Sequence, residues 1–276
     1  MITNTIYSMK KEMLRRRLSP RTIDSYIFCI KKFFNRVNKN PRKIRKKYVK
    51  EFLDDLAERK RSGSTLNVYL SAIKFLMNDV LRRNINLNFR YSKRPKKLPV
   101  YLNREELKRL FDAIKNPKDK LMIQLMYAAG LRVSELLNLR VKDFEIDMGF
   151  GWIRKGKGNK DRPFIIANRL KEELLYYIKE NNLMHDDFLF SRNGILPLHP
   201  RTVQEILKKA AKEAGIMKKV HPHMLRHSFG THLVEEENDL TDVQKLMGHN
   251  DIKTTMVYVH TASPKIISIK SPFDSL

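Results

Sequence analysis

Residues 91–100, YSKRPKKLPV, interrupt the chain with a segment that is unsuited to a regular helix or a buried strand. Pro95 and Pro99 disfavour helix both at their own positions and at the residues before them. The four Lys and Arg side chains of the segment favour contact with solvent. The sequence therefore predicts two domains, residues 1–90 and 101–276, joined by a basic linker at 91–100.

The charge of the chain is large and uneven. The net charge is +26, and residues 1–98 carry 27 Lys and Arg against 7 Asp and Glu, whereas the remaining residues carry 29 against 23. Such an excess predicts a polyanionic partner, either a nucleic acid or an acidic membrane surface. The plainer interpretations are a solvated basic face for the first domain and a merely flexible connector for the linker. No run of about 18 apolar residues is present, so no membrane span is predicted.

Cysteine content and the N-terminal sequence bear on the compartment. The chain has a single cysteine, Cys29, which excludes an internal disulfide framework and a zinc site built from cysteines. Residues 1–17 lack the apolar core of a signal peptide. These features predict a cytoplasmic protein. Cys29 lies among Tyr26, Ile30 and Phe33, and we interpret it as a small core residue rather than a reactive thiol.

The first domain is expected to be helical. Ser19 followed by Pro20 is an N-cap and first-turn signal, and apolar residues then recur at helical spacing. A second helix is expected at about 46–61 and a third from Gly63 onward. A short helix before Ser19 would complete a bundle of four.

The second domain is expected to be mainly α with a small β-hairpin, an α+β arrangement. Asn103 and Glu106 form a capping-box pattern at the start of a helix, and Gly130 ends a helix at 119–129 in a left-handed turn. Apolar segments near 150–153 and 164–166 predict two strands joined by a Gly-rich basic tip. Further helices are expected over three stretches: 168–181, 201–214, and from Pro222 onward.

The last quarter of the chain, residues 221–260, carries the chemically most informative pattern. His223 and Arg226 are three residues apart and so share one face of a helix. A guanidinium suits a phosphate, because it offers two parallel charge-assisted hydrogen bonds. Tyr258 follows His249 by nine residues, and cationic neighbours would make its hydroxyl easier to ionise. Together these groups fit an attack on a phosphodiester.

Local features of this quarter give further expectations. Gly230 lies on the same side of its helix as Arg226 and is expected to leave room for a backbone. Thr241 is expected to cap a short helix that ends at Gly248, and Asp251 to cap the helix that bears Tyr258.

Two basic positions upstream could join the same site. Arg132, flanked by Leu131 and Val133, is expected to be buried and to need a partner, either a bound phosphate or Glu135. The hairpin tip RKGKGNKDRP at 154–163 offers Lys155, Lys157 and Lys160 as proton donors. A solvated basic turn is the plainer interpretation of that tip.

A metal site is the competing interpretation of the histidines. His223 and His227 are four residues apart, a spacing used for zinc. The intervening glutamate of that motif and an evident third ligand are missing. We therefore predict no metal and no cofactor.

Four separated motifs together resemble the tyrosine recombinase (phage integrase) family. They are AAGLRVSELLNL at 128–139, GKGNKDR at 156–162, HMLRHSFGTHL at 223–233 and LMGHNDIKTTMVYVH at 246–260. LSPRTIDSYIFCIKKFF at 18–34 is similar to the family's DNA-clamping core-binding domain. The resemblance implies six catalytic residues: Arg132, Lys157, His223, Arg226, His249 and the nucleophile Tyr258.

The resemblance implies a site-specific DNA recombinase that cuts and rejoins strands through a 3′-phosphotyrosine, without ATP or metal. The partners it implies are double-stranded DNA with a specific site and further copies of the chain, as a tetramer on two sites and a monomer or dimer in solution. The short two-domain layout is most similar to Xer-type recombinases, and among them the archaeal XerA proteins, which resolve chromosome or plasmid dimers at a dif-like site. The alternatives are a virus or plasmid integrase, a type IB topoisomerase, or a DNA-binding regulator that retains the fold.

Overall fold

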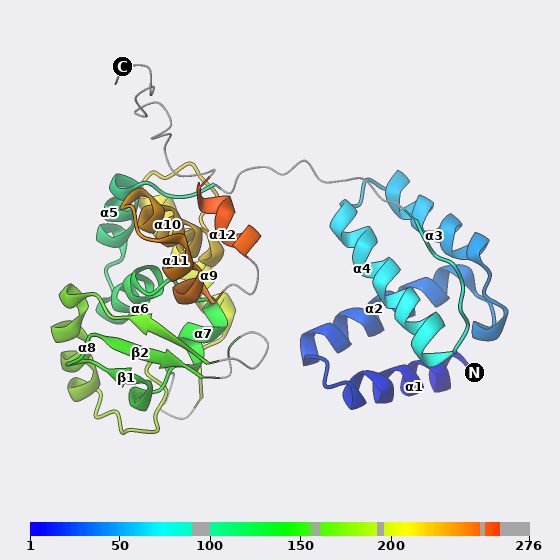
Figure 1. The fold of residues 1–276 in the computed structure, drawn as a ribbon, viewed down its shortest axis with the longest axis horizontal. Helices are drawn as coiled ribbons and strands as arrows, with labels where there is room; N and C mark the ends of the chain where they lie inside the picture. The colour runs from blue at the N-terminus through cyan, green and yellow to red at the C-terminus, as the bar shows by residue number, and fades with distance from the viewer. Residues whose placement is uncertain (90–99, 155, 157–160, 192–195, 249–251, 260–276) are drawn as a thin grey trace, which may run out of the picture. The chain divides into compact units, whose positions relative to one another are not determined.

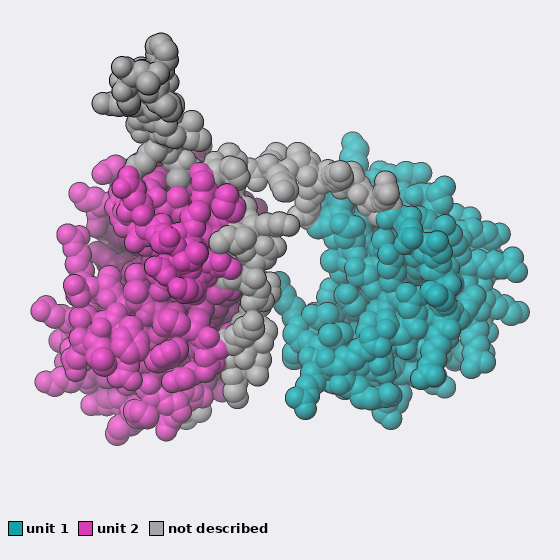
Figure 2. Space-filling view, viewed as in Figure 1, with its two compact units in different colours: residues 1–96 teal, residues 97–276 magenta. Residues whose placement is uncertain are grey.

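The computed structural model describes residues 1–89, 100–154, 156, 161–191, 196–248 and 252–259. The chain divides into two compact units, residues 1–96 and 97–276 (Figures 1 and 2). The prediction of a mainly helical chain with two domains and a small sheet is confirmed. Of the predicted linker only Val100 is described, so the linker's bounds stay a prediction.

The first unit is a helical bundle, as predicted. Ser19 caps α2 by accepting a hydrogen bond from the backbone N–H of Thr22 at 3.2 Å. The helix before Ser19 is 14 residues long rather than short. The helices are α1 (Ile2–Arg15), α2 (Pro20–Val37), α3 (Lys46–Glu58) and α4 (Gly63–Lys74), with a 3₁₀ turn at Pro41–Lys43 and a π-helical extension of α4 at Phe75–Val80.

Aromatic side chains fill the core of this unit. The Phe33 and Phe52 rings pack edge to face at 5.2 Å, and Phe52 packs in the same way on Tyr69 at 5.4 Å. Cys29 lies in this core and is 4% exposed, which confirms it as a packing residue. Burial raises the pKa of its thiol to about 11, so the side chain stays protonated and unreactive at neutral pH.

The second unit combines eight helices of the described residues with a three-stranded antiparallel sheet. The helices are α5 (Arg104–Ala113), α6 (Pro117–Ala128), α7 (Val133–Asn138), α8 (Asn168–Glu180), α9 (Pro200–Glu213), α10 (Pro222–Glu235), α11 (Leu240–Met247) and α12 (Ile252–Val259). A 3₁₀ turn at Val141–Asp143 leads into the sheet, whose strands are β1 (Phe144–Glu145), β2 (Phe150–Ile153) and β3 (Arg162–Ile165). Within the described residues, no helix is both long and apolar enough to span a membrane.

The sheet places one end of a hairpin toward the helices. Its order is β1-β2-β3, and Ile153 pairs with Arg162 where β2 and β3 lead into the hairpin tip. In β3, Arg162 and Phe164 are buried while Pro163 and Ile165 are exposed. Because side chains alternate between the two faces of a strand, Arg162 points to the same side as the buried Phe164.

Helix ends follow the sequence with one exception. Asn103 forms the predicted capping box, and Gly130 adopts a left-handed turn after α6 with φ of +56°. Gly248 ends α11 in the same conformation, as predicted. The prediction that Thr241 caps α11 is wrong, because Asp239 occupies the cap and its carboxylate accepts the Thr241 N–H at 2.7 Å.

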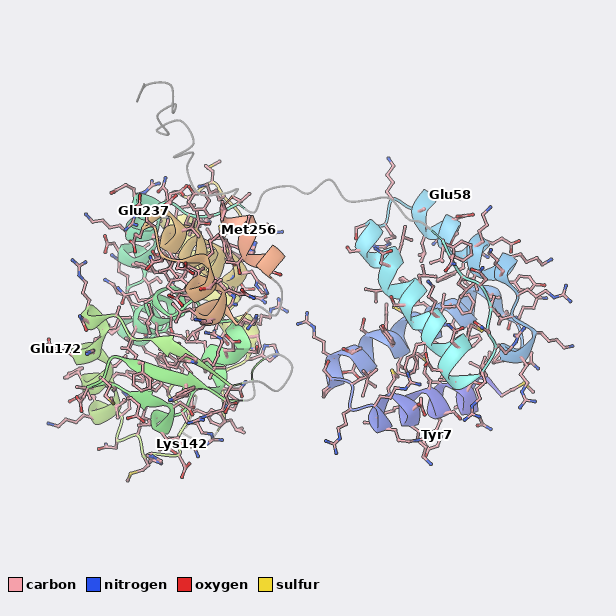
Figure 3. All side chains as sticks on the ribbon, viewed as in Figure 1. Tyr7, Glu58, Lys142, Glu172, Glu237 and Met256 are labelled. Carbon is pink, nitrogen blue, oxygen red and sulfur yellow. The ribbon has the colours of Figure 1, made fainter. Side chains whose placement is uncertain are left out.

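Helix α10 packs against four other helices of the second unit, α6, α9, α11 and α12. Met256 of α12, labelled in Figure 3, is 36% exposed. Tyr258 of the same helix is only 2% exposed and packs with Phe229, Val243 and Met247.

The space beside Gly230 is occupied by the Tyr258 ring. A Cβ atom placed on Gly230 would lie 2.7 Å from Cε2 and Cζ of that ring, closer than carbon atoms approach. The expectation that Gly230 leaves room for a backbone is therefore wrong among the described residues. The glycine lets α10 and α12 approach closely enough to bury the tyrosine.

We predict that Gly230→Ala lowers the free energy of unfolding by about 1–3 kcal/mol, because the added methyl group overpacks the contact with Tyr258. In a Tyr258→Ala background the same change should instead stabilise the protein by about 1 kcal/mol, since alanine is the better helix former. Urea unfolding of the four proteins of this double-mutant cycle measures both values. Equal effects of Gly230→Ala in the two backgrounds would contradict the contact.

Candidate active site

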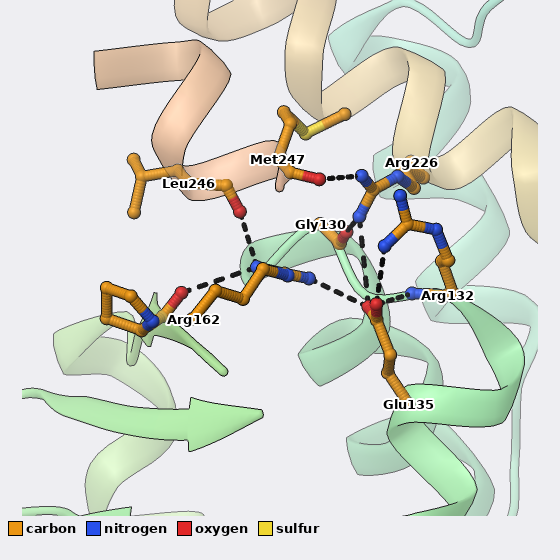
Figure 4. Close-up of polar contacts among 8 residues, drawn as sticks. Gly130, Arg132, Glu135, Arg162, Arg226, Leu246 and Met247 are labelled. Atoms are coloured by element: carbon orange, nitrogen blue, oxygen red, sulfur yellow. Dashed lines mark hydrogen bonds and ion pairs between the residues drawn. The ribbon is translucent and has the colours of Figure 1, made fainter. Parts of the chain in front are cut away.

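The polar centre of the second unit is a carboxylate surrounded by three guanidinium groups (Figure 4). Oε1 of Glu135 on α7 accepts a hydrogen bond from Nη1 of Arg132 at 2.5 Å. Its Oε2 accepts one from Nη2 of Arg162 at 2.8 Å, and Nη1 of Arg226 lies 3.9 Å from the same oxygen. Of the two partners expected for Arg132, the structure thus shows Glu135.

Arg226 is held mainly by backbone carbonyls. Its side chain is 4% exposed, and its Nη1 and Nη2 donate to the carbonyl oxygens of Gly130 and Met247. These carbonyls belong to the turn after α6 and to the end of α11, so the helical ends fix the guanidinium between them. Burial, followed by repulsion from Arg132 and Arg162, lowers the pKa of Arg226 to about 10, which leaves it protonated at neutral pH.

The cluster has an excess of positive charge. Burial alone would raise the pKa of Glu135, but attraction by Arg162 and Arg132 outweighs it and the pKa is lowered. Glu135 is therefore ionised at neutral pH and offsets one of three nearby cations. The exposed fraction of Arg132 is the largest of the four side chains, at 20%. An incoming anion such as a phosphate would be attracted here, and Arg132 is the guanidinium most accessible to it.

Arg162 was missed as a site residue, because the sequence places it within a basic hairpin tip. Its side chain is 8% exposed and contacts Glu135 rather than solvent. The signal that could have found it is the alternation of β3, which places Arg162 on the face of Phe164.

The histidines of α10 differ in their surroundings. His223 is exposed by its surface area, but its ring is desolvated by its neighbours, and this desolvation, followed by repulsion from Arg226, lowers its pKa. His227 lies with its ring centroid 6.4 Å from that of His223, and burial first lowers its pKa to about 4, so it is neutral. Among the residues that the structure describes, no three His, Cys, Asp or Glu side chains gather closely enough to hold a metal ion.

Tyr258 lies beside these groups. Its ring centroid is 5.9 Å from that of His227. Burial raises the pKa of its hydroxyl, and the positive charges of Arg226 and Arg132 act in the opposite direction. The tyrosine is thus within the electrostatic reach of both arginines, which is the surrounding that a phenolate would need.

Four of the six residues expected for the site come together in the second unit: Arg132, His223, Arg226 and Tyr258. The other two, Lys157 and His249, lie outside the described residues, as do the alternatives Lys155 and Lys160 and the expected cap Asp251.

Comparisons with known proteins show similarity along most of the chain. Residues 100–264 match the Phage integrase family, and residues 6–87 match the family's N-terminal SAM-like domain. A tyrosine recombinase of Pseudothermotoga lettingae is 34% identical over 256 residues, which cover 89% of both chains. The tyrosine recombinase XerA of Pyrococcus horikoshii is 35% identical over 246 residues, 87% of this chain and 83% of that protein.

Solved structures show the same fold. The XerH site-specific recombinase bound to its palindromic difH substrate, a post-cleavage complex, is 26% identical with a TM-score of 0.77. The match covers 94% of this chain and 82% of that one. With a family match over more than half its length and relatives at 34–35% identity along most of it, this chain belongs to the tyrosine recombinase (phage integrase) family.

Proposed function

We propose that this site-specific recombinase joins itself to DNA through Tyr258, with Arg132 and Arg226 holding the scissile phosphate. The observation that carries the proposal is the placement of Tyr258 beside a buried cluster that keeps an excess of positive charge around one carboxylate. In the tyrosine recombinase family the tyrosine attacks a phosphodiester, which is an anion that such a cationic cluster would bind.

The proposed reaction conserves bonds at every step. The phenolic oxygen of Tyr258 attacks phosphorus in line, the P–O5′ bond breaks, and a 3′-phosphotyrosine and a 5′-hydroxyl result. His223 assists removal of the phenolic proton, and Lys157 gives a proton to the leaving oxygen. The 5′-hydroxyl of a partner strand then attacks the phosphotyrosine and restores a phosphodiester. Because the ester retains the energy of the broken bond, the reaction balances without ATP or a metal ion.

The arginines act on the transition state. Attack on phosphorus gathers negative charge on the non-bridging oxygens, which Arg132 and Arg226 would stabilise from fixed positions. His249 would add a hydrogen bond to the same oxygens. Arg226 requires little rearrangement for this task, since two backbone carbonyls already orient its guanidinium.

The substrate we propose is double-stranded DNA with a specific recombination site. The first domain, with most of the excess positive charge, would clamp the duplex largely through its phosphates. A cytoplasmic location is part of this proposal, since such DNA would be met there.

Similarity to XerA and to XerH bound to difH supports Xer-type resolution of chromosome or plasmid dimers at a dif-like site. A virus or plasmid integrase is the alternative, and mapping the nucleotide trapped on nicked substrates with candidate sites would decide between them.

We predict that Tyr258→Phe retains DNA binding but forms no covalent adduct, because phenylalanine keeps the ring packing and lacks the hydroxyl. The measurement is adduct formation on a nicked suicide substrate, with a gel shift as the control for binding. The wild-type reaction should also proceed in EDTA. A protease-sensitive adduct formed by the variant would exclude Tyr258 as the nucleophile. If the protein is instead a DNA-binding regulator, the wild type will form no adduct either.

Arg132→Ala and Arg226→Ala should each slow cleavage by at least about a hundredfold, because each removes a donor to the transition state. The dissociation constant for DNA should change far less, since most of the phosphate contacts lie elsewhere. Single-turnover cleavage rates and gel shifts measure the two effects. Equal losses in binding and in cleavage would mark the arginines as ordinary DNA contacts.

The active assembly that we propose is a tetramer on two DNA sites, with the segment after the nucleophile docking on a neighbouring copy. That segment, residues 263–276, lies outside the described residues, and its Ile266, Ile267 and Ile269 are too few to form a core of their own. Deleting it should leave binding to one site nearly intact and weaken the pairing of two sites, as gel shifts with one and two sites would measure. Unchanged pairing and recombination would contradict the docking.

A further inference from the structure

Arg162 is a buried cation to which the proposed reaction assigns no role. It opens β3, and its residue is 7% exposed. Burial lowers its pKa, while attraction to Glu135 acts in the opposite direction. A buried guanidinium is costly unless its hydrogen bonds are made. The groups that Arg162 contacts therefore indicate which role offsets the cost of burying it.

Its contacts join three separate segments. Nη2 donates to Oε2 of Glu135 on α7 at 2.8 Å, and Nη1 donates to the carbonyl of Leu246 near the end of α11 (Figure 4). Nη1 also lies 3.3 Å from the carbonyl of Pro163 in its own strand. A Cβ atom on Gly248 would lie 2.6 Å from Cδ of Arg162, so the arginine stem packs directly against the turn after α11.

Two of these segments, α7 and α11, support arginines of the proposed mechanism. Helix α7 is preceded by Arg132, whose guanidinium shares Glu135 with Arg162. Helix α11 ends at Met247, whose carbonyl accepts a hydrogen bond from Arg226. A single side chain thus lies between the supports of both proposed phosphate-binding arginines.

Arg162 also affects how strongly Glu135 pairs with the other two arginines. Oε2 of Glu135 bonds to Arg162 at 2.8 Å, whereas Arg226 stays 3.9 Å from that oxygen. If Arg162 were neutral, Oε2 would lose its nearest cation and would attract Arg226 more closely. A closer pair with Glu135 would turn Arg226 away from an incoming phosphate and neutralise part of its charge.

We propose that Arg162 is a positioning residue for strand cleavage: it occupies Glu135 and braces the end of α11, so that Arg132 and Arg226 remain oriented and charged for the scissile phosphate. This inference rests on the proposed roles of those two arginines. Arg162 itself does not contact the reacting atoms in this scheme.

Three variants of the full chain test the proposal. Arg162→Met removes the charge and keeps much of the stem, and Arg162→Lys keeps the charge but cannot reach several acceptors at once. The matched control is Arg104→Met, which breaks an exposed pair with Glu236 at 2.7 Å in the same unit. We expect Arg162→Met to slow adduct formation at saturating DNA by about tenfold to a hundredfold, with Arg162→Lys in between and Arg104→Met unchanged. The dissociation constant for DNA should stay within about twofold of the wild type.

A substrate with a methylphosphonate at the scissile position separates positioning from general loss of structure. The methyl group replaces a charged oxygen, so stabilisation of negative charge by the arginines matters less on this substrate. The deficits of Arg162→Met and Arg226→Ala should therefore both shrink relative to their deficits on the natural phosphodiester. If only Arg226→Ala improves, the effect of Arg162 does not pass through the phosphate-binding arginines and the inference is wrong. If Arg226→Ala does not improve either, the proposed phosphate clamp fails instead.

A double-mutant cycle of Arg162 and Glu135 tests the proposal if Arg162→Met folds poorly. Glu135→Gln removes the charge that Arg162 is proposed to occupy, while keeping the shape of the side chain. Adding Arg162→Lys to Glu135→Gln should slow adduct formation less than Arg162→Lys does alone. A lysine that no longer reaches Oε2 leaves the carboxylate free to attract Arg226, whereas the glutamine carries no charge to attract it. Purely additive losses in this cycle would overturn the proposal.

Discussion

The site depends on one ionised carboxylate shared by three guanidinium groups. Glu135 contacts Arg132 and Arg162 directly and lies 3.9 Å from Arg226, so it fixes side chains that come from three different parts of the chain. A single negative charge among three cations makes the cluster stable enough to bury and still leaves it attractive to an anion. A second carboxylate would weaken that attraction, and a neutral residue in place of Glu135 would leave adjacent arginines to repel one another.

Backbone carbonyl groups, which carry no net charge, position Arg226. Arg226 donates to the carbonyls of Gly130 and Met247, at the ends of α6 and α11. Carbonyls at helix C-termini attract a cation through partial charges only, so they orient the guanidinium without cancelling it. This explains why the left-handed turn at Gly130 matters for chemistry as well as for chain direction: the turn aims a backbone carbonyl into the cluster.

Much of the fold and part of the site were predictable from local patterns. Capping residues, helical spacing and the left-handed glycines depend on neighbours in sequence, and the structure confirms Ser19, Asn103 and Gly130 in those roles. The i, i+3 spacing of His223 and Arg226 likewise depends on one helix alone. Arg162 and Gly230 were misjudged because their partners, Glu135 and Tyr258, are about 30 residues away in sequence and only the tertiary packing brings them together.

The burial of Tyr258 has a consequence for how the reaction would begin. Without DNA the ring is enclosed by α10 at Gly230, and burial raises the pKa of its hydroxyl against the pull of Arg226 and Arg132. A bound phosphate would offset part of the arginines' charge, so the cluster alone cannot both bind the phosphate and fully ionise the tyrosine. In the proposed reaction the phenolic proton leaves to a base during attack, and the lowering of the pKa of His223 by desolvation and by Arg226 favours the neutral imidazole that the proposed base requires. The packing that encloses the proposed nucleophile would thus make its activation depend on a base that accepts the proton.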